Sequence, residues 1–134
     1  MVMVDIDRNA ILAEPLNSRN DAEVTRAYQT MMLQLNQESI ERRKHILDNQ
    51  VLGSTKKIIC DEYQMKMELV PPGCHVTNAS EVVIRNFKPH FLSALAGTAN
   101  GFSTLMWDLL IEQIDITVNL VRQSNAAPNV SAYS

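Results

Sequence analysis

Short apolar runs alternate with longer amphipathic segments along the chain. The first two runs, residues 1–6 and 10–13, are rich in Val and Ile and are separated by the polar turn Asp7-Arg8-Asn9. Short runs bounded by turn residues are typical of strands, so the sequence predicts an antiparallel hairpin here. Two further runs, residues 45–47 and 65–70, predict strands later in the chain.

Four segments carry a helical pattern. In the first, apolar residues recur three and four positions apart, which predicts an amphipathic helix whose buried face comprises Val24, Ala27, Tyr28, Met31, Met32 and Leu35. Residues 54–63 and 78–95 predict two more helices. Residues 102–121 are apolar nearly all round, so we expect the longest helix there, buried or in an interface. Pro89 predicts a kink or break near Phe87–Lys88, because proline removes a helix hydrogen bond.

Together these elements predict an α/β domain over residues 1–124, followed by an irregular tail at 125–134. The chain has 134 residues, of which 46% are hydrophobic, and this composition is globular and argues against disorder. Its formal net charge of -3 has the wrong sign for a stand-alone nucleic-acid-binding protein, so any nucleic-acid contact must come from a local patch.

The cysteines and the lengths of the apolar runs bear on the compartment. Cys60 and Cys74 do not make a disulfide framework or a four-ligand zinc site, and they fit a reducing compartment. No run reaches the roughly 18 apolar residues that a membrane helix needs. The sequence therefore predicts an intracellular protein with no membrane partner, without distinguishing nucleus from cytoplasm.

Two carboxylates stand at the ends of predicted elements. Asp48 follows the run at 45–47, where ligands meet an α/β sheet, and Glu81 falls in the first turn of the helix at 78–95. Arg85 and Lys88 lie four and seven residues after Glu81, on the same helical face.

Each of these residues, considered by itself, also has a possible structural role. Asn78 and Glu81 have the spacing of a capping box, and Asp48 can form an Asx-type turn with the next residue. Arg85 and Lys88 are either phosphate contacts or a solvated face, with Glu81 and Arg85 forming a helical ion pair.

An ordered set of motifs extends over essentially the whole chain. It comprises MVDIDRNAILAEPL at 3–16, ILDN at 46–49, LVPP at 69–72, NASEVVIRNFKPHF at 78–91, LMWDLLIEQIDITVNLVR at 105–122 and NVSAY at 129–133. This set resembles the catalytic core of copia-type retrotransposon integrases, within the retroviral integrase superfamily. The resemblance implies an RNase H-like fold with a short mixed sheet and helices packed on its faces. It also implies DNA integration by metal-dependent strand transfer, with DNA as partner.

The resemblance assigns Asp48 and Glu81 as the second and third catalytic carboxylates, which hold Mg²⁺ or Mn²⁺, and makes Arg85 and Lys88 candidate DNA contacts. The family's first acid lies on its first strand, which is the central strand of the sheet and has no match in this sequence. We therefore expect an incomplete, truncated fold with the central strand missing, and a chain that is inactive alone. The alternative function is a non-catalytic interaction module that self-associates or binds a protein through its apolar long helix and open sheet edge.

Overall fold

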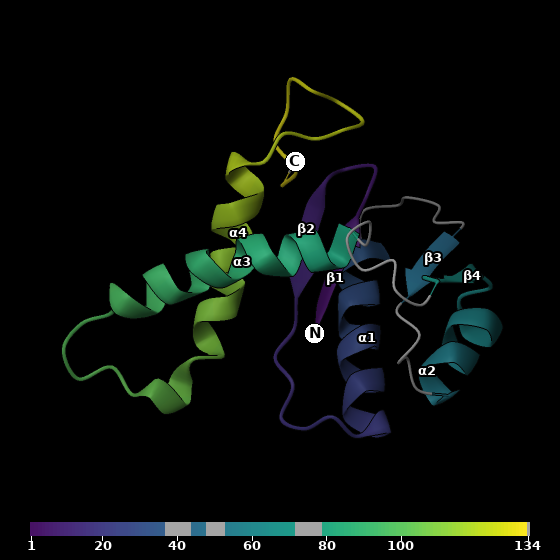
Figure 1. The fold of residues 1–134 in the computed structure, drawn as a ribbon, viewed down its shortest axis with the longest axis horizontal. Helices are drawn as coiled ribbons and strands as arrows, with labels where there is room; N and C mark the ends of the chain where they lie inside the picture. The colour runs from purple at the N-terminus through teal and green to yellow at the C-terminus, as the bar shows by residue number, and fades with distance from the viewer. Residues whose placement is uncertain (37–43, 48–52, 72–78, 134) are drawn as a thin grey trace. The chain divides into compact units, whose positions relative to one another are not determined.

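The computed structural model describes residues 1–36, 44–47, 53–71 and 79–133, and it confirms a mixed α/β chain. Contacts divide the chain into two compact units, one containing Leu16–Asn78 with Met1, and the other containing Val2–Pro15 with Ala79–Ser134. The elements follow the order β1 (Val2–Asp5), β2 (Ala10–Ala13), α1 (Asp21–Asn36), β3 (Lys44–Leu47), α2 (Gly53–Lys57), a π-helical turn (Ile58–Glu62), β4 (Lys66–Leu69), α3 (Ala79–Ala96), a 3₁₀ turn (Thr104–Met106) and α4 (Leu109–Val121) (Figure 1).

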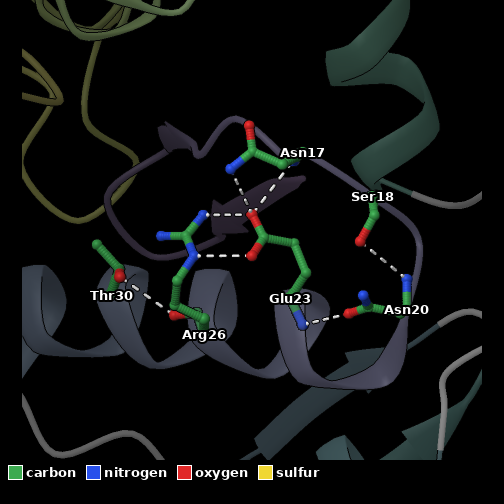
Figure 2. A network of polar contacts seen from close by, with 6 residues as sticks. All are labelled: Asn17, Ser18, Asn20, Glu23, Arg26 and Thr30. Atoms are coloured by element: carbon green, nitrogen blue, oxygen red, sulfur yellow. Dashed lines mark hydrogen bonds and ion pairs between the residues drawn. The ribbon is translucent and has the colours of Figure 1, made fainter.

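In the unit that contains Leu16–Asn78, a polar network fixes the start of α1 (Figure 2). The Asn20 side chain accepts a hydrogen bond from the Glu23 backbone N–H at 2.8 Å, as a helix cap does. The Glu23 carboxylate in turn accepts bonds from the Asn17 backbone N–H at 3.1 Å and from the Arg26 guanidinium at 3.0 Å. The bond from Arg26, followed by that from Asn17, lowers the pKa of Glu23. Asn20 is therefore the cap residue of α1.

The apolar face of α1 lies where the periodicity predicts it. Its buried residues are Ala27, Tyr28, Met31, Met32 and Leu35, which are five of the six expected, whereas Val24 is half-buried. The helical pattern at 54–63 corresponds to α2 and the π-helical turn after it, where Ile59 is fully buried. Strands β3 and β4 pair in parallel, with Leu47 opposite Leu69.

In the unit that contains Val2–Pro15, β1 and β2 form the predicted antiparallel hairpin, with Val4 opposite Ile11. One face of this hairpin packs against α3 and α4. The core of the unit comprises Ile11 from β2, Val83 and Phe87 from α3, and Ile114 and Val118 from α4. Val2, Val4 and Ala13 pack around this core from the same face of the hairpin.

Asp115 and Asn119 of α4, together with Arg122 directly after it, bind the backbone of β2 and of Asn9 before it, along the edge that β1 leaves free. Asn119 accepts a bond from the Ile11 N–H at 2.8 Å and donates one to the Ile11 carbonyl at 2.7 Å. Asp115 accepts a bond from the Ala13 N–H at 2.8 Å, and Arg122 donates to the Asn9 carbonyl at 2.7 Å. Residues four apart on a helix are separated by about 6 Å along its axis, and residues two apart on a strand by about 6.8 Å. Side chains four residues apart on α4 can therefore reach alternate residues of β2. The side chains of α4 thus replace a neighbouring strand on this edge.

The described residues contain two separate two-stranded sheets, β1–β2 and β3–β4, where the sequence predicts one short mixed sheet. The strands themselves fall where they are expected. The hairpin supplies the antiparallel pairing and β3–β4 supplies the parallel pairing.

Of the kink or break predicted near Phe87–Lys88, the break is wrong, because α3 continues through Pro89 from Ala79 to Ala96. Proline lacks the N–H that would bond to the carbonyl of Arg85, four residues earlier, and its ring crowds that carbonyl. Phe87 and Phe91 on either side of Pro89 pack against the core of the unit, and this packing offsets one lost bond.

The predicted long helix at 102–121 is also wrong in its length. The Ser103 hydroxyl accepts a bond from the Leu105 N–H and caps a separate 3₁₀ turn at Thr104–Met106. Helix α4 begins only at Leu109 and is shorter than α3. The apolar residues of the segment 102–121 are only partly buried: Leu105 is 87% exposed, Leu109 61% and Val121 77%. Burial within the chain therefore does not explain its all-round apolar character.

The tail after α4 is irregular but attached to the turn of the hairpin. The Ala126 N–H donates to the Asp7 carbonyl at 2.7 Å, and the Asn125 amide donates to the Ile6 carbonyl at 2.8 Å. Gln123 and Ser131 form an isolated antiparallel bridge that closes the tail on itself. The tail after α4 therefore packs against the hairpin turn, a contact that the sequence patterns did not predict.

Candidate functional site

Asp48 lies outside the described residues, directly after β3. Its position is therefore known only through the strand that precedes it. Leu47 at the end of β3 is buried, and its carbonyl accepts a bond from the Val70 N–H at 2.9 Å. Because β3 and β4 are parallel, Asp48 follows the carboxyl end of a parallel strand pair, which is the edge where α/β sheets meet ligands.

Aromatic side chains hold the strand that leads to Asp48. Nδ1 of His45 on β3 lies 3.1 Å from the hydroxyl of Tyr28 on α1, and the Tyr28 and Tyr63 rings meet edge to face. Burial lowers the pKa of His45 and raises the pKa of Tyr28. A neutral imidazole can accept a hydrogen bond from the Tyr28 hydroxyl at Nδ1, and this contact holds His45 as a structural anchor of β3.

Glu81 occupies the first turn of α3, where its side chain is half-buried. The helix begins at Ala79, and Asn78, the predicted cap residue, lies outside the described residues. A carboxylate in a first turn is favoured by the helix dipole, whether or not it also holds a metal. The same Asn-x-x-Glu spacing serves as a cap in α1, where Asn20 and Glu23 are used structurally.

Arg85 and Lys88 are both exposed on α3. They lie one and two turns below Glu81, on the side of the helix away from the buried Val83 and Phe87. Their guanidinium and ammonium groups are therefore directed to solvent, as contacts to a phosphate backbone require. The same position also suits two ordinary solvated cations.

Of the two predicted metal ligands, the structure positions only Glu81. Asp48 belongs to one compact unit and Glu81 to the other, and Asp48 is outside the described ranges. Within the described ranges, no group of three or more His, Cys, Asp or Glu side chains is arranged to hold a metal ion. Asp5, which precedes the hairpin turn, is used structurally: its carboxylate accepts bonds from the backbone N–H groups of Asp7 and Arg8 at 3.1 and 3.2 Å.

Sequence reasoning missed Asp115, a carboxylate with an unusual environment. Its Oδ2 binds the Ala13 N–H, whereas its Oδ1 is buried and has no hydrogen-bond partner among the described residues. Burial, with a smaller contribution from Glu14, raises the pKa of Asp115 to about 7, although the Ala13 N–H acts in the opposite direction. The available signal was the recurrence of Asp115, Asn119 and Arg122 at i, i+4 and i+7 along α4 and its C-cap.

Comparison with protein-family models finds no match to this chain, and comparison with curated proteins finds none either. Among the described residues, every helix is too short or too polar to cross a lipid bilayer.

Proposed function

We propose that this chain is the core of a copia-type integrase that lacks a match for the first catalytic strand, and that it takes part in metal-dependent DNA strand transfer only when a further carboxylate is supplied. Asp48 and Glu81 are its metal ligands, and Arg85 and Lys88 contact DNA phosphates. The observation that carries the proposal is the parallel β3–β4 pair with Asp48 directly after β3.

The order and pairing of the elements support this proposal. A sheet that loses its central strand divides into the strands on either side of it. The chain has an antiparallel hairpin, β1–β2, and a parallel pair, β3–β4, as separate two-stranded sheets. The helix that carries Glu81 then follows β4, as the resemblance expects.

The carboxylate oxygens of Asp48 and Glu81 are of the type that hard divalent cations bind. Mg²⁺ and Mn²⁺ prefer oxygen ligands, and Mg²⁺ is commonly held by one or two carboxylates with water in its other positions. Asp48 and Glu81 supply two such groups. Bound divalent ions polarise phosphoryl oxygens and stabilise the attacking and leaving oxygens during phosphoryl transfer. With two carboxylates from this chain in place of three, we expect metal binding without strand transfer.

Arg85 and Lys88 would act by positioning the DNA backbone. Each exposed cation that neutralises a phosphate releases a counterion, which makes binding depend on salt. Since the formal net charge of the chain is -3, these local contacts must overcome a weak overall repulsion. We expect weak DNA binding that is lost at moderate salt concentration.

Metal binding by purified variants tests the proposal. Mn²⁺ titration followed by electron paramagnetic resonance should show binding that falls about tenfold or more in Asp48→Asn and in Glu81→Gln, as loss of a direct ligand predicts. Glu112→Gln is the matched control, because Glu112 is an exposed first-turn glutamate of α4. A nicking assay on supercoiled DNA with Mn²⁺ should give no product from the wild-type chain.

Two results would overturn the proposal. Unchanged Mn²⁺ binding in both Asp48→Asn and Glu81→Gln would remove the two residues from any metal site. Conversely, metal-dependent nicking by the wild-type chain would show that the missing carboxylate is not needed.

The exposed apolar surface at the start of α4 favours a second candidate function, a protein-interaction module. Leu105 and Leu109 are 87% and 61% exposed, and the Trp107 ring meets Phe91 edge to face beside them. Exposed apolar clusters of this kind mark interaction sites. If this surface binds a protein, Leu105→Lys with Leu109→Lys should abolish that binding and leave Mn²⁺ binding intact, whereas retained binding would exclude the surface.

A further inference from the structure

The loop between α3 and the 3₁₀ turn contains the dipeptide Asn100-Gly101. The Phe102 N–H donates to the Ala99 carbonyl at 3.0 Å and closes a four-residue turn around this dipeptide. Gly101 takes the third position of the turn with a φ of 101°, and a positive φ at that position is typical of a type II turn and favours glycine. The turn therefore depends on a residue without a side chain directly after an asparagine.

The peptide group between Asn100 and Gly101 is free to rotate and to react. Residues 99–101 are exposed, and nothing lies within 4 Å of the position that a Cβ atom of Gly101 would take. Among the described residues, neither the Gly101 N–H nor the Asn100 side-chain amide makes a hydrogen bond. The core contacts of the adjoining helices come from residues outside this loop, such as Phe87 and Ile114, so rotation of this peptide group disturbs none of them.

From this geometry we propose that Asn100 is a site of spontaneous deamidation, which proceeds through a cyclic imide with Gly101 and yields aspartate and isoaspartate. The Gly101 nitrogen loses its proton to base and attacks Cγ of Asn100. The new N–Cγ bond forms, the Cγ–Nδ2 bond breaks, and the side-chain nitrogen leaves as ammonia.

Water, the only co-reactant, then opens the five-membered imide. Attack of water at Cγ gives aspartate at position 100, whereas attack at the backbone carbonyl carbon gives isoaspartate, whose main chain runs through Cβ and Cγ. Either product replaces a neutral amide by a carboxylate. The loop therefore gains one negative charge, and in isoaspartate its main chain is longer by one carbon.

The dipeptide Asn17-Ser18 provides a comparison within the same chain, because both of its residues are also exposed. Its surroundings oppose the reaction. The Asn17 side-chain amide donates to Oε1 of Glu23 at 3.4 Å, and the Asn17 backbone N–H donates to the same oxygen at 3.1 Å (Figure 2). The Asn17 side chain is thus held away from the next nitrogen, and the Ser18 side chain crowds that nitrogen. Asn100 has neither restraint.

The modification should change the loop and leave the fold intact. A small increase in the length of an exposed loop costs little free energy. Circular dichroism of Asn100→Asp, which carries the charge of the product, should therefore match that of the wild type.

Incubation of the full chain in mildly alkaline buffer at body temperature tests the proposal. Isoelectric focusing should show an acidic form that accumulates, and peptide mapping should place the change at Asn100. An isoaspartyl methyltransferase with a radioactive methyl donor should label this form. Asn100→Gln should lose it, because glutamine would have to form a less favourable six-membered ring, whereas the matched control Asn17→Gln should accumulate it as the wild type does.

A comparison with the chain unfolded in urea separates the effect of the structure from that of the dipeptide alone. Because the folded loop leaves Asn100 free, its rate should agree within several-fold with and without urea, whereas Asn17 should react markedly more slowly in the folded chain. The proposal would be overturned if Asn100 reacts in urea and stays intact in the folded chain, or if Asn100→Gln accumulates the acidic form at the wild-type rate. Neither measurement involves metal or DNA, so this inference and the proposed function can fail separately.

Discussion

Replacing Asp115 by asparagine should change how the stability of the chain depends on pH. In the folded chain Oδ1 of Asp115 is buried without a hydrogen-bond partner among the described residues, so the ionised form is disfavoured. Burial raises its pKa from 3.8 to about 7. The folded state therefore holds a proton that the unfolded state releases, and stability falls as the pH rises between these two values.

The size of the effect follows from the shift in pKa. A difference of about three pKa units corresponds to about 4 kcal/mol, at about 1.36 kcal/mol for each unit. Because Asp115 is only half-buried, screening by water reduces this to about 2 kcal/mol. Asp115→Asn has no proton to lose, and its side-chain oxygen still accepts the Ala13 N–H. We therefore expect the variant to be the more stable chain by about 2 kcal/mol at pH 8 and nearly equal to the wild type at about pH 4.

Urea unfolding followed by circular dichroism, at several pH values from about 4 to 8, gives this difference directly. Subtracting the wild-type curve from the variant curve cancels the other titrating groups, including His45, whose lowered pKa acts in the opposite direction. Glu112→Gln is the control, because Glu112 is exposed on the same helix. It shows how much of the difference comes from replacing an exposed carboxyl on this helix.

A flat difference for Asp115→Asn would refute the reasoning. It would mean that Asp115 is ionised without penalty in the folded chain. A difference that shrinks as the pH rises would show that the carboxylate is instead stabilised as an anion.

Three further changes test the packing and anchoring of the two units by the same unfolding measurement. Asn119→Ala should cost about 2–4 kcal/mol, because it leaves both backbone groups of Ile11 unpaired, and a loss below about 1 kcal/mol would show that water replaces the side chain. Phe87→Ala should cost about 3–5 kcal/mol through the cavity it leaves in the core, and a cost near that of an exposed residue would contradict the packing. Tyr28→Phe should cost about 1 kcal/mol and free the His45 ring, visible as a shift of its imidazole NMR signals; unchanged signals would count against the contact.

The local elements follow from sequence patterns because each is specified by its own residues. The turn at Asp7-Arg8-Asn9 predicts the hairpin, and the period of α1 predicts its buried face. Sequence patterns predict less well where a helix begins and whether it continues through a proline. Whether Pro89 breaks α3 depends on the core contacts of Phe87 and Phe91, and a 3₁₀ turn capped by Ser103 separates the apolar residues near 105 from α4.

Contacts between distant segments could not be derived from patterns. Asn119 lies far along the chain from Ile11, and the bonds between them became evident only once α4 was seen beside β2. The candidate site has the same limitation. Glu81 falls in the first turn of a helix and Asp48 directly after a strand, as the sequence predicts, but whether they share an ion is a tertiary question that helical or strand periodicity does not address.

Paramagnetic broadening of backbone amide NMR signals by Mn²⁺ tests most directly whether Asp48 and Glu81 hold the same ions. Signals from residues flanking both acids should broaden together at the same Mn²⁺ concentration, while those around Glu112 remain sharp. Broadening around only one of the two acids, or around neither, would contradict a shared metal site.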